Sequence, residues 1–208
     1  MSAVLLFCLG FLFLFAVIEL LQKQLLTKHK WARKATHILS GGIIFLMPYW
    51  LSAAQVVFLA VFFTLLLSVS KWKKLLSLHE VDRYTIGEIL YPLSIGAVAL
   101  ISLPRHLEVF QASCLILALS DGLAGTIGEA WDFKTLKLGR NKKSLGGALV
   151  FFLCTISILS GFYGFSVMPF TSILLIALIL TLAEFMLIFG SDNLFIPVLA
   201  AWLILSFL

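Results

Sequence analysis

The chain alternates long apolar runs with short polar links. A helix of roughly 20 apolar residues crosses a bilayer core of about 30 Å. We expect eight such spans, at residues 3–21, 35–51, 54–70, 84–103, 108–127, 145–163, 169–189 and 194–208. The last run is short. The pattern therefore predicts an all-α bundle of about seven to eight transmembrane helices, forming one domain over residues 1–208.

Basic residues fall in alternate links. All but one of the 15 Lys and Arg residues lie in the links 23–34, 71–83 and 134–143, and Arg105 is the exception. Alternate links of a multi-span chain lie on one side of the membrane, and basic links mark the cytoplasmic side. The sequence therefore predicts these three links in the cytoplasm and both termini outside.

Composition excludes an ordinary soluble protein. Hydrophobic residues make up 62% of the chain and charged residues only 12%, whereas a soluble domain carries about 25% charge. The net charge of +5 is the usual topology signal of a membrane protein, so we expect the lipid bilayer and no nucleic acid as a partner. The three cysteines lie in apolar runs, without the spacing of a zinc site or a disulfide framework.

One carboxylate interrupts the fifth apolar run. Asp121 shares a helical face with Ala124, Gly125 and Gly128, at spacings of i+3, i+4 and i+7. Ionisable residues at membrane depth are costly and are candidates for function. Two interpretations stay open: a tight helix contact with a structurally paired aspartate, or a ligand site in which Asp121 holds a cation.

A basic, glycine-rich segment follows that run. Lys142, Lys143 and Ser144 directly precede a helix that opens with Gly146 and Gly147. Free backbone N–H groups and lysines at a helix N-terminus suit phosphate groups. Either Ser144 or the nearby asparagine at position 141 can cap this helix. The alternative is a basic loop that only sets the orientation of the chain in the membrane. The segment matches neither a Walker A loop nor a G-x-G-x-x-G motif.

Further charged residues are expected at the same membrane face. Arg33 and His37 repeat at i and i+4 beside Lys34, and Asn193 lies in the link before the last span. The candidate metal ligands are Asp121, Glu129, Asp192, Glu88 and Glu184. Carboxylates hold Mg²⁺ and link it to substrate phosphates, and cations neutralise a transferring phosphoryl group. This pattern favours nucleotide-dependent chemistry on a lipid headgroup at the cytoplasmic interface.

These segments resemble a known enzyme family. Together they resemble the dolichol kinase and phytol kinase family, to which the phosphatidate cytidylyltransferases are distantly related. The resemblance rests on SDGLAGTIG at 120–128, NKKSLGG at 141–147, RKATH at 33–37, GEILYP at 87–92, and Glu184 with DNLFIP at 192–197. It extends in order over nearly the whole chain.

The resemblance implies a polytopic enzyme that phosphorylates a lipid alcohol of the phytol, farnesol, polyprenol or dolichol type. The donor would be CTP, with ATP as the alternative, and the cofactor Mg²⁺ or another divalent cation. Asp121, Lys142 and His37 would be catalytic, with the metal held by the carboxylates named above. The nucleotide would contact Lys142, Lys143, Ser144, Arg33, Lys34, Asn193, Gly125 and Gly128.

The chain shows neither a long amino-terminal extension nor a plastid leader. We therefore expect a compact prokaryotic enzyme of the plasma membrane that acts on a shorter isoprenoid alcohol, and a homodimer is compatible with the sequence. A cytidylyltransferase is the nearest rival and would release pyrophosphate instead of CDP. A transporter is the other, but it predicts inverted repeats and broken midplane helices, for which the sequence gives no sign.

Overall fold

The computed structural model describes residues 2–25, 29–73, 85–103, 105–130, 134–138 and 141–208. Almost all described elements are helical, which confirms the predicted all-α class. The elements are α1 (Ser2–Leu25), α2 (His29–Leu46), a 3₁₀ turn (Met47–Tyr49), α3 (Ala53–Trp72), α4 (Gly87–Ser102), α5 (Leu107–Leu115), a π-helical turn (Ile116–Asp121), α6 (Gly122–Ala130), β1 (Thr135–Leu138), β2 (Asn141–Ser144), α7 (Leu145–Val167), α8 (Phe170–Met186) and α9 (Asp192–Phe207).

A helix occupies each of the eight expected spans. Within the described part of the chain, four helical stretches are long and apolar enough to cross a membrane: Ala3–Gln22, Ala53–Trp72, Leu107–Gly128 and Leu145–Val167. The helices α4, α8 and α9 are apolar but shorter. The exact number of spans therefore stays a prediction. Helix α2 begins at His29, earlier than the expected residue 35, so its first turns carry the basic segment.

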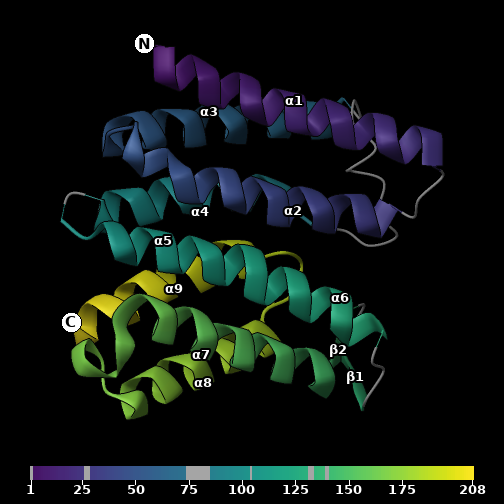
Figure 1. Ribbon diagram of the computed structural model, residues 1–208. Coiled ribbons are helices and arrows are strands. Elements are labelled where there is room, and N and C mark those ends of the chain that lie inside the picture. Colours follow the sequence, from purple (N-terminus) through teal and green to yellow (C-terminus); the bar gives the residue numbers. More distant parts are fainter. Residues whose placement is uncertain (1, 26–28, 74–84, 104, 131–133, 139–140) are drawn as a thin grey trace.

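The helices run roughly side by side in a bundle (Figure 1). Helix α1 lies at one edge and packs mainly on α2, while α4 packs between α3 and α9, and α7 packs against α6 and α8. Both termini lie at one end of the bundle, and the antiparallel β1–β2 hairpin lies at the other (Figure 1). The end of α1, the start of α2 and the hairpin, which the basic links adjoin, therefore lie together at the end opposite the termini (Figure 1).

The bundle carries apolar side chains both inside and outside. Its centre contains fully buried residues such as Phe110, Phe151 and Ile176. Large apolar side chains such as Phe13 on α1 and Phe58 on α3 are more than half exposed. A soluble protein rarely leaves such broad apolar surface in water. The outer surface therefore indicates hydrocarbon surroundings and an integral membrane protein.

The π-helical turn Ile116–Asp121 interrupts the fifth span between α5 and α6. Its backbone hydrogen bonds enclose one residue more than those of an α-helix, so the side-chain directions after it differ from those of an unbroken helix. Ser120, inside the turn, shares a buried 3.1 Å hydrogen bond with Thr155 on α7. The turn therefore helps to set the direction of Asp121, its last residue.

Candidate functional site

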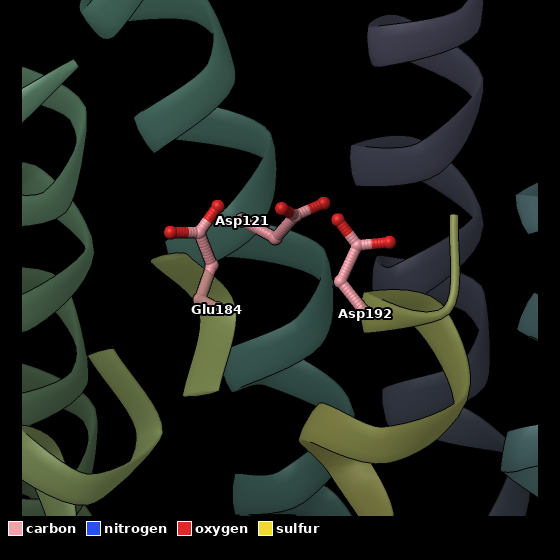
Figure 2. Close-up of side chains that lie close together, drawn as sticks. All are labelled: Asp121, Glu184 and Asp192. Carbon is pink, nitrogen blue, oxygen red and sulfur yellow. The ribbon is translucent and has the colours of Figure 1, made fainter. Parts of the chain in front are cut away.

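Three carboxylates form a group inside the bundle, toward the end that carries the hairpin. Asp121 ends the π-helical turn, Glu184 lies in the last turn of α8, and Asp192 begins α9. One oxygen of each lies within 4.8 Å of the other two, and Figure 2 shows the three carboxyl groups close together. The Glu184 side chain is only 8% exposed. A site of three negative charges so close together needs positive charge to be stable.

Lys143 supplies part of that charge. Its ammonium group donates hydrogen bonds to the carboxylate of Glu184 and, at 2.9 Å, to the backbone carbonyl of the same residue. It also lies 3.8 Å from the carboxylate of Asp192. Burial alone would lower the pKa of Lys143, but the charges of Glu184 and Asp192 outweigh this and raise it above its ordinary value. Lys143 is therefore a cation at every physiological pH.

The link between α8 and α9 fixes Asp192. Gly190 adopts φ +86° and packs directly on Gly87, because a Cβ atom at Gly190 would lie 2.5 Å from the backbone nitrogen of Gly87. The Asn193 side-chain amide donates a 2.8 Å hydrogen bond to the Gly87 carbonyl, and the Ile86 N–H donates to the carbonyl of Phe189 at 3.1 Å. The start of α4 therefore holds the start of α9 in place beside the carboxylates.

His37 approaches the group from α2. Its Nε2 atom lies 3.6 Å from a carboxylate oxygen of Asp121 and 2.9 Å from the carbonyl oxygen of Leu117. A carbonyl oxygen only accepts hydrogen bonds, so Nε2 carries the proton in this arrangement. The rings of His37 and Tyr91 stack obliquely with centroids 4.4 Å apart. The hydroxyls of Tyr91 and Ser40 both donate to the His37 carbonyl.

The start of α7 lies against α6 through small residues. Ser144 caps α7, because its hydroxyl accepts a 3.0 Å hydrogen bond from the Gly147 N–H, and it donates to the Gly128 carbonyl at 3.0 Å. A Cβ atom at Gly128 would lie 2.8 Å from the Cα of Gly147. One turn earlier in α6, the Gly125 carbonyl accepts a hydrogen bond from the Lys34 ammonium. Of the two expected caps, Ser144 is the one observed.

The other predicted site residues have different surroundings. Glu88 is not part of the three-carboxylate group and pairs with Lys71 at 2.6 Å. Asn193 is 5% exposed and directs its amide to Gly87, as described above. The side chains of Arg33, Glu129 and Lys142 lie outside the described part of the structure, although their backbones belong to α2, α6 and β2. The roles expected of these residues stay predictions.

Sequence reasoning missed several features of this site. The partnership of Lys71 with Glu88 joins α3 to α4, and sequence gives no measure of such a distance. Tyr91, which orders His37, could have been found, because it follows Glu88 by three residues and so shares its helical face. The strand Thr135–Leu138 alternates polar and apolar residues, which is the pattern of a β-strand.

The donor set suits a hard divalent cation. Mg²⁺ binds carboxylate oxygens, usually one or two from the protein together with substrate phosphates. Asp121, Glu184 and Asp192 offer such oxygens within a small space, and Lys143 already satisfies part of the negative charge there. Phosphoryl transfer needs a cation, positive side chains and a positioned acceptor more than covalent chemistry from the protein. The described residues provide carboxylates that could bind such a cation and, in Lys143, a positive side chain.

Comparison with known proteins gives one informative relative. The chain is 31% identical over 195 residues to the phytol kinase of Synechocystis sp., and the alignment covers 88% of this chain and 83% of the relative. No protein-family model matches the chain. No solved structure matches it either.

Proposed function

This chain belongs to the phytol kinase family and is a lipid-alcohol kinase, and we propose that it transfers the γ-phosphoryl group of CTP to an isoprenoid alcohol such as phytol. The observation that carries the proposal is the group formed by Asp121, Glu184 and Asp192, with His37 3.6 Å from Asp121. A membrane enzyme that phosphorylates an alcohol needs a metal site and a base at the end of an apolar bundle, and this group combines both.

Asp121 is the acceptor-side carboxylate in this proposal. The alcohol oxygen forms a bond to the γ-phosphorus while the bond from that phosphorus to the β-phosphate oxygen breaks, and CDP leaves. The hydroxyl proton passes to the carboxylate of Asp121, and His37 holds that carboxylate in position. Asp121, Glu184 and Asp192 would hold Mg²⁺, which when bound neutralises charge on the donor phosphates.

Lys143 is the proposed phosphate-binding cation. Its ammonium bonds to Glu184, which keeps the charge at the site until a nucleotide offers phosphate oxygens instead. The neighbouring Lys142, Ser144, Gly125 and Gly128, with Arg33, Lys34 and Asn193, are proposed to line the nucleotide site. Support comes from the Ser144-capped start of α7, where backbone N–H groups and the helix dipole favour phosphate.

The site is proposed to face the cytoplasm of a prokaryotic cell. Lys34, Lys71 and Lys143 each belong to one of the three basic links, and their contacts are with Gly125, Glu88 and the carboxylate group respectively. These three lysines, one from each basic link, thus lie on the same side of the bundle as the candidate site. Since basic links mark the cytoplasmic side, CTP would reach the site from the cell interior.

The test is a phosphoryl-transfer assay on the purified protein in liposomes. CTP and ATP labelled at the γ-phosphate are supplied with Mg²⁺ and, in separate reactions, phytol, farnesol, polyprenol or diacylglycerol. We expect labelled isoprenoid phosphate with CTP, and none with the Asp121→Asn variant. Glu108→Gln is the matched control, because Glu108 is an exposed carboxylate in the first turn of α5, away from the site.

Two outcomes would overturn the proposal. Pyrophosphate released only when a lipid phosphate is added would identify a cytidylyltransferase. Label in lipid with ATP but not with CTP would keep the kinase and reject the proposed donor.

A further inference from the structure

An apolar cleft lies beside the carboxylate group. About 840 Å³ of space free of protein atoms lies along it between α1, α2, α3 and α4, and part of this space is open to the surroundings of the protein. Its walls are mostly aromatic and aliphatic, and include Phe11, Phe15, Ile44, Leu59, Phe63 and Ile95. In a bilayer, apolar space of this kind is filled by hydrocarbon. The residues around this space determine which hydrocarbon binds there.

The cleft has one polar end. His37, Ser40 and Tyr91 line it there, together with Glu88 and Asn193. These residues come from the first two turns of α4, the first turn of α9 and the polar half of α2. A lipid chain with no polar head would leave their groups facing hydrocarbon, which is costly. A hydroxyl at the head of the chain matches the donors and acceptors at this end.

His37 connects the cleft to the carboxylate group. It lines the cleft, and its Nε2 atom lies 3.6 Å from the carboxylate oxygen of Asp121. A hydroxyl held at the polar end is therefore next to the residue proposed to take its proton. The cleft and the carboxylate group meet at this one histidine.

Met47 and Val56 mark the opposite end of the cleft. Both line it and both are buried. A rise of about 1.5 Å per residue places Met47 about 15 Å from His37 along the axis of α2. This is about half of a hydrocarbon core of about 30 Å. The cleft is therefore long enough for one chain of moderate length, and it ends where α2 is joined to α3, since Met47 directly follows α2 and Val56 lies in the first turn of α3.

We infer that this cleft binds the hydrocarbon chain of the acceptor and selects alcohols with a single isoprenoid chain of moderate length. The inference rests on the proposed function, since it takes the acceptor hydroxyl to lie at His37. The cleft has one polar end and an apolar far end, which matches one hydroxyl on one chain, so diacylglycerol with its two acyl chains is the alcohol that it disfavours. Val56 and Met47 determine the longest chain that the cleft encloses completely.

The test is a matched pair of substitutions on α3. Val56→Phe fills the far end of the cleft, and Val61→Phe adds the same volume at a side chain that is 49% exposed on α3 and does not line the cleft. We expect Val56→Phe to lower kcat/KM for phytol by about tenfold or more, because pocket contacts of this size have effects of that order. For the shorter geraniol the same variant should stay within about twofold of the wild type, by the same reasoning.

The inference predicts that the effect of each substitution depends on the chain length of the alcohol. Val61→Phe should leave both alcohols unchanged, and Met47→Ala should improve the use of alcohols longer than phytol. An equal loss for phytol and geraniol in Val56→Phe, or a chain-length effect in Val61→Phe, would overturn the inference. If Val56→Phe does not fold, the response of Met47→Ala alone decides.

A second measurement separates this inference from the proposed function. A phytol analogue with a photoreactive group at its tail is cross-linked to the wild-type protein in liposomes, and the labelled residues are identified by mass spectrometry. Labelling at Val56, Leu59 or Met47 that excess phytol suppresses and excess diacylglycerol does not would support the cleft, even if no phosphate were transferred. Labelling spread over exposed side chains such as Leu153 would overturn it, whatever the kinase assay shows.

Discussion

The imidazole of His37 on α2 lies 3.6 Å from the carboxylate of Asp121 at the end of the π-helical turn. The same ring nitrogen lies 2.9 Å from the Leu117 carbonyl, so α2 and the π-helical turn meet at this histidine. The proposed acceptor carboxylate therefore lies against a side chain of a neighbouring helix.

Asp121→Asn should abolish most activity. The change removes the negative charge and the base while it keeps the shape of the side chain. We expect kcat to fall on the order of 100-fold or more, as when one electrostatic group is lost from an active site. The thermal unfolding temperature should change little, because removing a like charge relieves repulsion from Glu184 and Asp192. Full activity in a folded Asp121→Asn protein would contradict the proposed role.

His37→Ala should lower kcat less than Asp121→Asn does, and added imidazole should restore part of the lost activity. Residues that orient a catalytic group typically contribute about 10- to 100-fold, and we expect kcat to fall within that range. Added imidazole should restore part of the activity of His37→Ala and none of that of Asp121→Asn. A stability role alone predicts no rescue, so unchanged activity in imidazole would reject positioning by His37.

Lys143→Met should destabilise the protein and make it respond to Mg²⁺. The change leaves Glu184 and Asp192 without their cation, and removing one partner of a buried ion pair costs about 3–5 kcal/mol. Added Mg²⁺ should raise the unfolding temperature of the variant more than that of the wild type, because the cation replaces the lost charge. Lys143→Arg is the control. An equal response of all three proteins to Mg²⁺ would show that the carboxylates do not bind it.

The contribution of Lys143 should be insensitive to pH in the physiological range. Because its folded-state pKa is raised above the ordinary value of 10.5, its stabilising charge is fully present below that pH and fades only as the pH rises through the folded-state value. The difference in unfolding temperature between wild type and Lys143→Met should therefore be constant from about pH 7 to 9, since lysine remains charged there. A difference that declines across this interval would contradict the raised pKa.

Substitution by alanine should have different effects on stability at two adjacent glycines. A Cβ atom at Gly41 would lie 2.1 Å from the Cβ of Ala118 in the π-helical turn, whereas one at Gly42 would have no atom within 4 Å. Gly41→Ala should lower the free energy of unfolding by about 1–3 kcal/mol, the usual cost of overpacking. Gly42→Ala should be neutral or stabilising by up to about 1 kcal/mol, because alanine favours a helix. Thermal unfolding in detergent measures both.

Sequence reasoning predicted the helices well because a bilayer requires long apolar runs, and those runs are visible in the chain. It also predicted that Asp121, Glu184 and Asp192 lie at one membrane face, since each lies at the same end of an alternating span, and the structure brings the three together. It could not separate Glu88, on the same face, from these three. The rotation of each helix about its axis decides which carboxylates meet, and that rotation follows from packing contacts such as Gly190 against Gly87.

The π-helical turn could not be predicted from the sequence for a related reason. Its apolar residues satisfy an α-helical and a π-helical pattern almost equally, so periodicity over six residues does not distinguish them. What distinguishes them is tertiary: Gly41 packs against Ala118, and Ser120 bonds to Thr155.

The π-helical turn also bears on how relatives of this chain should be aligned. A π-helical turn accommodates one residue more than an α-helical turn between the same two neighbours. A homologue with an unbroken α-helix here would need a one-residue gap between positions 116 and 121 to keep its aspartate in register with Asp121. An ungapped alignment would pair that aspartate with the wrong column, about 100° around the helix, and would make a shared residue look like a substitution.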